Sequence, residues 1–142
     1  MDYEMAIIQR LQAEVDYIKF FYGKAAEYGF DESIKRWWVY VEDFELPAGW
    51  KQTFTPILVT TSQYYPSDPP DGFFLSNELC DIYDRKPSHY FEEKSAHNSL
   101  SHKNWAWYCI HPDWNPGYDI RDGDSIAKYL TLIHLTLSEA IR

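Results

Sequence analysis

The chain has 142 residues, of which 45% are hydrophobic and 18% aromatic, and its formal net charge at pH 7 is −9. A single domain of this size can bury a core that folds independently, and this hydrophobic content excludes a disordered chain. An acidic chain with no cluster of lysine and arginine cannot neutralise many phosphates, so we expect no nucleic-acid partner and instead a protein partner with a basic surface.

The two cysteines, Cys80 and Cys109, are too few for a disulfide framework. The N-terminus lacks a basic segment followed by an apolar one, which predicts no signal peptide. No apolar run approaches the roughly 20 residues of a membrane span. We therefore expect one domain over residues 1–142, in the cytoplasm, with reduced thiols and no contact with a membrane.

An amphipathic helix is expected over residues 2–28, because its apolar residues recur at steps of three and four. Gly29 is the expected C-terminal stop of this helix. The residues that share its apolar face are Ile8, Leu11, Val15, Ile18 and Tyr22.

Three strands are expected next, over residues 37–44, 54–62 and 73–76, because these runs are rich in aromatic and β-branched residues. The connection "YYPSDPPDG" (64–72) holds three prolines, which fix φ and remove backbone donors, so it is expected to lie outside regular structure. Residues 81–104 are polar and irregular, which predicts a long loop.

The segment over residues 105–111 alternates in character, so an extended chain would place Trp105, Trp107, Cys109 and His111 on one side. A last helix is expected to begin near Asp124 as N-cap. Strands grouped between two helices predict an α+β fold. The apolar face of the last helix comprises Ile126, Tyr129, Leu130, Ile133 and Leu137.

The pair Cys109-x-His111 allows several interpretations. Zinc needs about four ligands, usually in paired spacings, and one such pair does not supply them, so we predict no metal site. No GxSxG motif marks a hydrolase, and "HPD" (111–113), which also occurs in J-domain co-chaperones, lacks the surrounding helices. A buried structural cysteine and a reactive thiol both remain open, because exposure decides between them.

The stretch "FTPILVTTSQYYPSDPPDGFFL" (54–75) resembles the second-to-third strand region of ubiquitin-conjugating E2 enzymes, which carry a YPxxPP turn between two strands. E2 enzymes then have a catalytic cysteine, a Trp-x-Pro and a helix, and this chain has the same order. The residues that match the turn are Tyr65, Pro66, Pro69 and Pro70, and those that match the later pattern are Cys109, Trp114 and Pro116.

The closer similarity is to prokaryotic E2 family E, through "FELPAGW" (44–50), "YYPSDPPDGFF" (64–74) and a Trp-rich segment ending at His111 before "WNPGYD" (114–119). The resemblance implies an E2-like (UBC) fold with an N-terminal helix, an antiparallel meander and a C-terminal helix. It also implies a carrier that receives a ubiquitin-like protein from an E1/ThiF-like adenylating enzyme as a thioester on Cys109. The chain itself needs no cofactor, since the E1 uses the ATP.

Members of this family tend to be encoded beside E1/ThiF-like enzymes, ubiquitin-like proteins and metal-dependent deconjugating peptidases of the JAB type. Some of these gene sets act in anti-phage defence. The resemblance therefore implies these partners and a bacterial ubiquitination-like pathway.

One departure from the E2 pattern is that the His-Pro-Asn tripeptide, whose asparagine stabilises the oxyanion, is missing. Asn98 and Asn104 are the nearest substitutes, although Asn98 is rather far from the cysteine and Asn104 rather near. His111 is expected within reach of the thiol as base or hydrogen-bond donor. Asp119 is either a residue that orients an incoming lysine or an ordinary turn residue.

The tryptophans and the proline turn are expected to be scaffold, and Cys80 to be core. Two other functions stay open. The first is a catalytically inactive E2-fold module that binds a ubiquitin-like protein or an E1, which suits the missing tripeptide and the many aromatic residues. The second is a free-thiol or metal-binding protein of unrelated fold.

Overall fold

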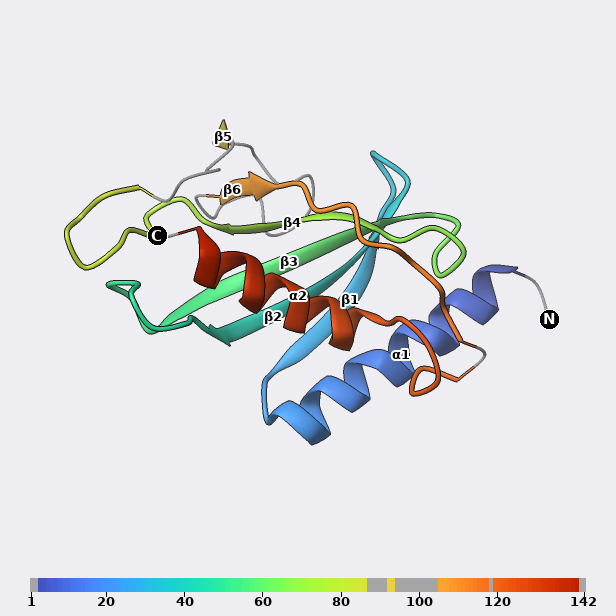
Figure 1. Cartoon of the computed structure of the whole chain (residues 1–142). Coiled ribbons are helices and arrows are strands. Elements are labelled where there is room, and N and C mark those ends of the chain that lie inside the picture. The colour runs from blue at the N-terminus through green and yellow to red at the C-terminus, as the bar shows by residue number, and fades with distance from the viewer. Residues whose placement is uncertain (1–2, 87–91, 94–104, 118, 141–142) are drawn as a thin grey trace.

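The computed structural model describes residues 3–86, 92–93, 105–117 and 119–140 (Figure 1). Two helices, α1 (Tyr3–Tyr22) and α2 (Ile126–Glu139), flank a series of strands along the chain. The strands form one sheet in the order β1-β2-β3-β4-β6-β5, and each neighbouring pair is antiparallel. Their bounds are β1 Ala26–Asp31, β2 Arg36–Glu45, β3 Phe54–Ser62, β4 Pro70–Ser76, β5 Glu92–Glu93 and β6 Trp105–Tyr108.

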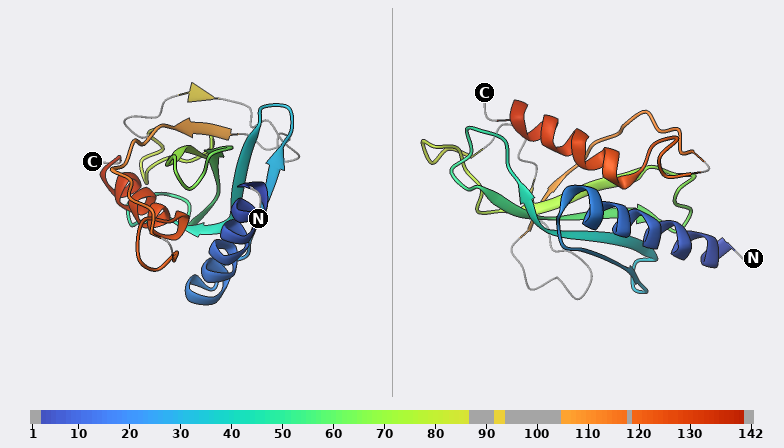
Figure 2. Two further views of the ribbon diagram at one scale, coloured as in Figure 1. Left: turned by 90° about the vertical axis from the view of Figure 1, so that its right-hand side faces the viewer. Right: turned by 90° about the horizontal axis from the view of Figure 1, so that it is seen from below.

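Both helices lie on the same face of the sheet (Figures 1 and 2). The main core lies between the helices and this face, as in residues Leu11, Val59 and Ile133, which are fully buried. Side chains alternate along a strand, so the opposite face carries a second, smaller cluster. That cluster is aromatic and consists of Tyr40, Leu58, Phe74 and Trp105, with Trp38 and Trp107 packed against it. The predicted α+β class is confirmed.

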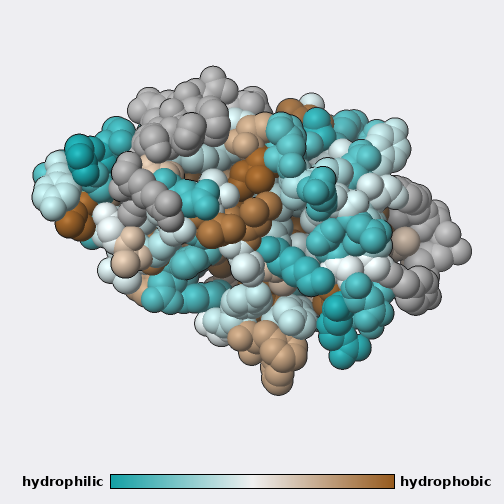
Figure 3. Space-filling view, viewed as in Figure 1, coloured by the Kyte–Doolittle hydropathy of each residue, from teal (hydrophilic) through white to brown (hydrophobic). Residues whose placement is uncertain are grey.

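The surface that carries the helices is largely hydrophilic (Figure 3). Apolar side chains gather at its centre, over α2, and at the C-terminal end of α1 (Figure 3). The exposed residues on these two helices include Leu135 on α2 and Phe20 and Phe21 on α1. Neither helix in the described part of the chain is long and apolar enough to cross a membrane.

The first helix ends earlier than predicted, at Tyr22, because Gly23 follows in a left-handed conformation (φ 63°) that suits a C-terminal glycine. The next residues form β1, a strand that was not predicted. Gly29 is therefore not a helix stop. It lies in β1 under the indole of Trp38, where an added Cβ would come within 2.4 Å of a ring carbon.

The buried face of α1 also differs from the prediction. Leu11, Val15 and Ile18 are buried as expected, whereas Ile8 and Tyr22 are exposed. Ile7 and Glu14 take the remaining buried positions. The burial of Glu14 is the main surprise, because an acidic residue is almost never fully buried without partners.

The three predicted strands are present as β2, β3 and β4. β4 begins at Pro70, so the expectation that residues 64–72 lie outside regular structure is wrong for residues 70–72. A proline is tolerated as the first residue of a strand, since it needs no ladder donor there. Because β1 precedes them, the two strands that resemble the E2 pattern are the third and fourth of this chain rather than the second and third.

Two further boundaries differ. The extended segment ends at Tyr108, so Cys109 and His111 lie just beyond β6. β5 (Glu92–Glu93) falls within the predicted loop 81–104, of which only residues 81–86 and 92–93 are described.

The N-cap of α2 is Ser125, whose hydroxyl accepts from the backbone N of Lys128 at 3.3 Å. All five residues predicted for the apolar face of α2 are buried.

Candidate active site

Cys109 is the first residue after β6, and its side chain is exposed. The interpretation of Cys109 as a buried structural cysteine is therefore wrong. Its Sγ lies 2.9 Å from Nε2 of His111 and 3.8 Å from the carbonyl oxygen of Asp71, to which the thiol donates. The structure thus brings together the two residues that the spacing predicted to share one side.

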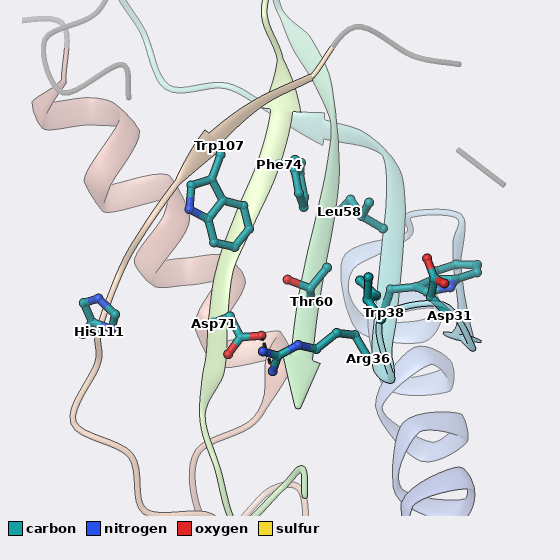
Figure 4. Close-up of a pocket in the computed structure, with 10 residues that line it drawn as sticks. Asp31, Arg36, Trp38, Leu58, Thr60, Asp71, Phe74, Trp107 and His111 are labelled. Atoms are coloured by element: carbon teal, nitrogen blue, oxygen red, sulfur yellow. Dashed lines mark ion pairs between the residues drawn. The ribbon is translucent and has the colours of Figure 1, made fainter. Parts of the chain in front are cut away.

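His111 lines a groove of about 340 Å³ on the sheet face opposite the helices (Figure 4). The wall of the groove is largely aromatic, with Trp38 from β2, Phe74 from β4 and Trp107 from β6. Leu58 and Thr60 contribute from β3, which lies between them. The candidate nucleophile therefore lies beside a surface that can hold an extended chain or an apolar side chain.

An ion pair crosses this groove from β2 to β4. Nη1 of Arg36 lies 3.0 Å from Oδ2 of Asp71, and the carboxylate lies between the guanidinium and His111 (Figure 4). Burial raises the pKa of the Asp71 carboxyl, while the charges of Arg36 and His111 act in the opposite direction. The backbone carbonyl of Asp71 thus contacts the Cys109 thiol, while the Asp71 side chain lies in the groove.

The two motifs that resemble E2 enzymes contact each other. Nε1 of Trp114 donates to the carbonyl oxygen of Pro66 at 2.7 Å, and the Trp114 ring lies 6.0 Å from the ring of Tyr65. Tyr65 and Pro70 are buried, and Pro69 is half-buried. The proline turn therefore holds the segment that follows Cys109 and His111.

The end of that segment is fixed to the start of α2. Pro116 forms an isolated bridge with Asp124. Oδ2 of Asp124 accepts from the backbone N of Asn115 at 2.6 Å, which explains why Asp124 does not cap the helix. A Cβ atom added at Gly117 or Gly123 would collide with the facing backbone. The closest approach would be 2.0 Å, between a Cβ on Gly123 and the backbone N of Gly117.

Glu14 and Arg10 of α1 are the residues that the sequence analysis missed. The Glu14 carboxylate is fully buried and accepts from the Tyr65 hydroxyl at 2.5 Å, the backbone N of Ile126 at 2.6 Å and Nε of Arg10 at 3.3 Å. Burial raises its pKa, and these three partners act in the opposite direction. The signal was present, since an acidic residue lies on the apolar stripe between Leu11 and Ile18.

Arg10 extends this network to the segment after Trp114. Its Nη1 donates to the carbonyl oxygen of Gly117 and its Nη2 to that of Asp124, each at 2.9 Å. Through Glu14 and Arg10, α1 therefore contacts the proline turn, the loop before α2 and the first residue of α2. These contacts position the scaffold of the site from the far end of the sequence.

The remaining predicted residues lie apart from the thiol or outside the described residues. Asp119 pairs within its own turn with Arg121, whose Nε and Nη2 donate to it at 3.3 and 3.2 Å and whose contacts lower its pKa. Asn98 and Asn104 lie outside the described residues. Cys80 is half-buried, 3.8 Å from Nε2 of Gln52. The described residues include no group of three or more His, Cys, Asp or Glu placed to hold a metal ion.

Comparison with known proteins identifies one family. Residues 18–140 match the family model described as Prokaryotic E2 family E. No curated protein and no solved structure matches the chain. The matched segment includes every strand, the Cys109–His111 pair and α2. The chain therefore belongs to prokaryotic E2 family E and is an E2-like protein, as the sequence resemblance predicted.

Proposed function

We propose that this chain is a carrier that accepts a ubiquitin-like protein from an E1/ThiF-like enzyme as a thioester on Cys109 and transfers it to a target amine. The observation that carries the proposal is the exposed Cys109 thiol, 2.9 Å from the His111 imidazole. A thiol beside a base is the arrangement that nucleophilic catalysis by cysteine requires.

In the first step, Nε2 of His111 accepts the proton of the Cys109 thiol. The thiolate attacks the carbonyl carbon of the thioester on the E1. A bond forms between Sγ and that carbon, and the bond from the carbon to the E1 sulfur breaks. The departing thiolate takes up a proton, so the E1 leaves with a free thiol and Cys109 holds the ubiquitin-like protein.

In the second step, the amine of a target attacks the same carbonyl carbon, and the Cys109 thiolate leaves. His111 takes the proton that the amine loses and can return it to the thiolate. Exposure of Cys109 suits both steps, because two large proteins must reach it in turn. For the partners and the setting we propose, by analogy with the family, a bacterial ubiquitin-like conjugation pathway with a JAB-type deconjugating peptidase and a role in anti-phage defence.

A second candidate is a binding module that holds a ubiquitin-like protein or an E1 without a covalent bond. The missing His-Pro-Asn tripeptide favours this alternative. The two candidates differ in one product, a covalent adduct on Cys109.

The test mixes the protein with its E1, the ubiquitin-like protein and ATP and resolves the products on a non-reducing gel. We expect a DTT-sensitive adduct that Cys109→Ala abolishes and that Cys80→Ala, the matched control, retains. Cys109→Ser should give an ester that resists DTT and is cleaved by hydroxide. An adduct that persists in Cys109→Ala, or no adduct with an E1 that charges itself, contradicts the carrier.

A further inference from the structure

The groove beside Cys109 runs across the strands of the sheet rather than along one of them. His111 lies at the end next to the thiol, and Asp31 lies at the opposite end (Figure 4). A segment that enters at the thiol can therefore follow the groove over the width of the sheet. The side chains that β6, β4, β3, β2 and β1 contribute to it include Trp107, Asp71, Thr60, Trp38 and Asp31.

The spacing of the strands sets the length of this path. Strands β6, β4, β3, β2 and β1 are neighbours in that order, so the path crosses four spacings of about 4.8 Å, or ~19 Å in all. An extended chain advances ~3.3 Å per residue and covers this distance in about five or six residues. The volume of about 340 Å³ is at the lower end of the range for ligand pockets, which suits a short segment rather than a folded surface.

Asp31 has a carboxylate oxygen without a partner. The side chain is 9% exposed, and its Oδ1 accepts from the backbone N and the Oγ of Ser33 at 3.0 and 2.6 Å. Its Oδ2 is buried and has no hydrogen-bond partner among the described residues. Because buried acidic side chains are almost always paired, this end of the groove lacks a cation.

The neighbouring arginine leaves this charge uncompensated. Arg36 is the cross-strand partner of Asp31, yet its described ion pair is with Asp71, with Nη1 3.0 Å from Oδ2. The formal charges of the three side chains therefore leave one negative charge. The indole of Trp38 lies over Gly29, which is on the same strand face as Asp31. A cation suits both features, since the carboxylate attracts it and tryptophan makes the strongest cation–π contacts.

We propose that the groove binds the C-terminal tail of the ubiquitin-like protein while its last carbonyl is bonded to Cys109, and that it selects a basic side chain about five or six residues from that end. This inference deepens the proposed carrier function and rests on it. The tail leaves the thiol at His111 and follows the aromatic wall to Trp38. Its arginine or lysine lies over that ring, where the charge of Asp31 attracts it. This attraction acts over several ångströms, so Oδ2 itself needs no exposed surface.

The tail fits this groove better than a segment of the target does. The tail stays covalently attached at Sγ for the lifetime of the thioester, so it must lie along the surface next to the thiol. The target presents one amine to the carbonyl and needs no path of this length. The net charge of −9 also favours a basic occupant.

The test attaches a model tail to Cys109 through a disulfide, in a Cys80→Ala background. Peptides of about eight residues, all alanine except for one arginine, end in a cysteamine amide whose thiol exchanges with Cys109. A matched set carries citrulline, which has the shape of arginine without its charge. Intact mass gives the β-mercaptoethanol concentration that releases half of each peptide, and binding in the groove raises this concentration.

We expect the arginine peptide to need about fivefold more β-mercaptoethanol than the citrulline peptide when this residue is fifth or sixth from the thiol. At the second residue the ratio should be within about twofold. Asp31→Asn, which keeps an Oδ1 acceptor for Ser33, should bring the ratio at the fifth and sixth residues to within about twofold. Asp43→Asn, at an exposed position of β2 outside the groove, is the matched control and should preserve it.

Equal release of the arginine and citrulline peptides from the parent protein overturns the inference, and so does a preference that Asp31→Asn retains. A preference that does not depend on the position of arginine also overturns it and favours a basic segment of the target instead. A Cys109 that forms no disulfide with either peptide overturns it as well, because a tail could not then enter the groove from the thiol.

The test needs neither E1 nor ubiquitin-like protein, so it separates this inference from the carrier function. If the preference is found but a competent E1 fails to charge Cys109, the carrier function is wrong and the selectivity of the groove stands. If the E1 charges Cys109 and the preference is absent, only the groove inference is wrong.

Discussion

The Glu14 carboxylate accepts a hydrogen bond from the Tyr65 hydroxyl at 2.5 Å, and both side chains are fully buried. This contact joins α1 to the proline turn, and the backbone N of Ile126 on the same carboxylate joins both to α2. A charge at the junction of three segments far apart in the sequence is therefore part of the framework that places Cys109 and His111.

Replacement of Glu14 by alanine should destabilise the fold strongly. The change leaves the Tyr65 hydroxyl, the N–H of Ile126 and the Arg10 guanidinium without their shared acceptor. Loss of one partner from a buried ionic network costs about 3–5 kcal/mol, which urea unfolding would measure. Glu4→Ala, at an exposed position on the same helix, is the control and should stay within about 0.5 kcal/mol of the parent.

The contribution of Glu14 should also depend on pH. Burial raises its pKa in the folded state above the ordinary 4.5. A raised pKa means that the folded protein binds the proton more tightly. The part of the stability that is linked to this proton is therefore complete below the unfolded pKa and is lost as pH rises through the folded one. Urea unfolding of the parent and of Glu14→Gln should therefore differ most in favour of the parent at the acid end, and a difference that grows with pH would be the opposite result.

Two tyrosine-to-phenylalanine changes should have opposite effects on stability. Tyr65→Phe removes a donor to a buried carboxylate and should lower the free energy of unfolding by about 1.5–3 kcal/mol. Tyr129→Phe removes a hydroxyl with no partner among the described residues and should leave stability unchanged or slightly higher. Thermal melts of both variants test this pair of predictions. A marked loss in Tyr129→Phe would reveal a structural hydrogen bond at that hydroxyl.

His111→Ala should slow formation of the Cys109 adduct, because no imidazole would then accept the thiol proton. General-base catalysis contributes about 10²–10⁴-fold, so charging by the E1 should fall at least about 100-fold at neutral pH. The melting temperature should change little, since His111 is exposed. His134→Ala, on α2 beside Phe44, is the matched histidine control. Normal charging of His111→Ala would remove the base role.

The strands and the site differ in how much of them the sequence reveals. β2 and β3 were predictable, because their runs of aromatic and β-branched residues favour strands locally. β1 was not, since Ala26–Asp31 contains a glycine and two charged residues. It is held by its ladder with β2 and by the Trp38 ring over Gly29. Such tertiary contacts leave no local pattern.

The candidate site was likewise predictable only in part. The proximity of Cys109 and His111 was predicted from their two-residue spacing, although both residues lie just beyond β6. The burial of Glu14 could also have been predicted, because this residue lies on the apolar stripe of the first helix, but it was not. The burial of Tyr129 was predictable from its place on the α2 face, whereas the lack of a partner for its hydroxyl depends on segments distant in the sequence.

The most direct measurement of the central claim is the intact mass of the protein after incubation with its E1, the ubiquitin-like protein and ATP, followed by peptide mapping. The carrier function predicts a gain equal to one ubiquitin-like protein minus one water, reversed by DTT and located on Cys109. An E1-dependent adduct on any other residue, or an unchanged mass beside a fully charged E1, would contradict it.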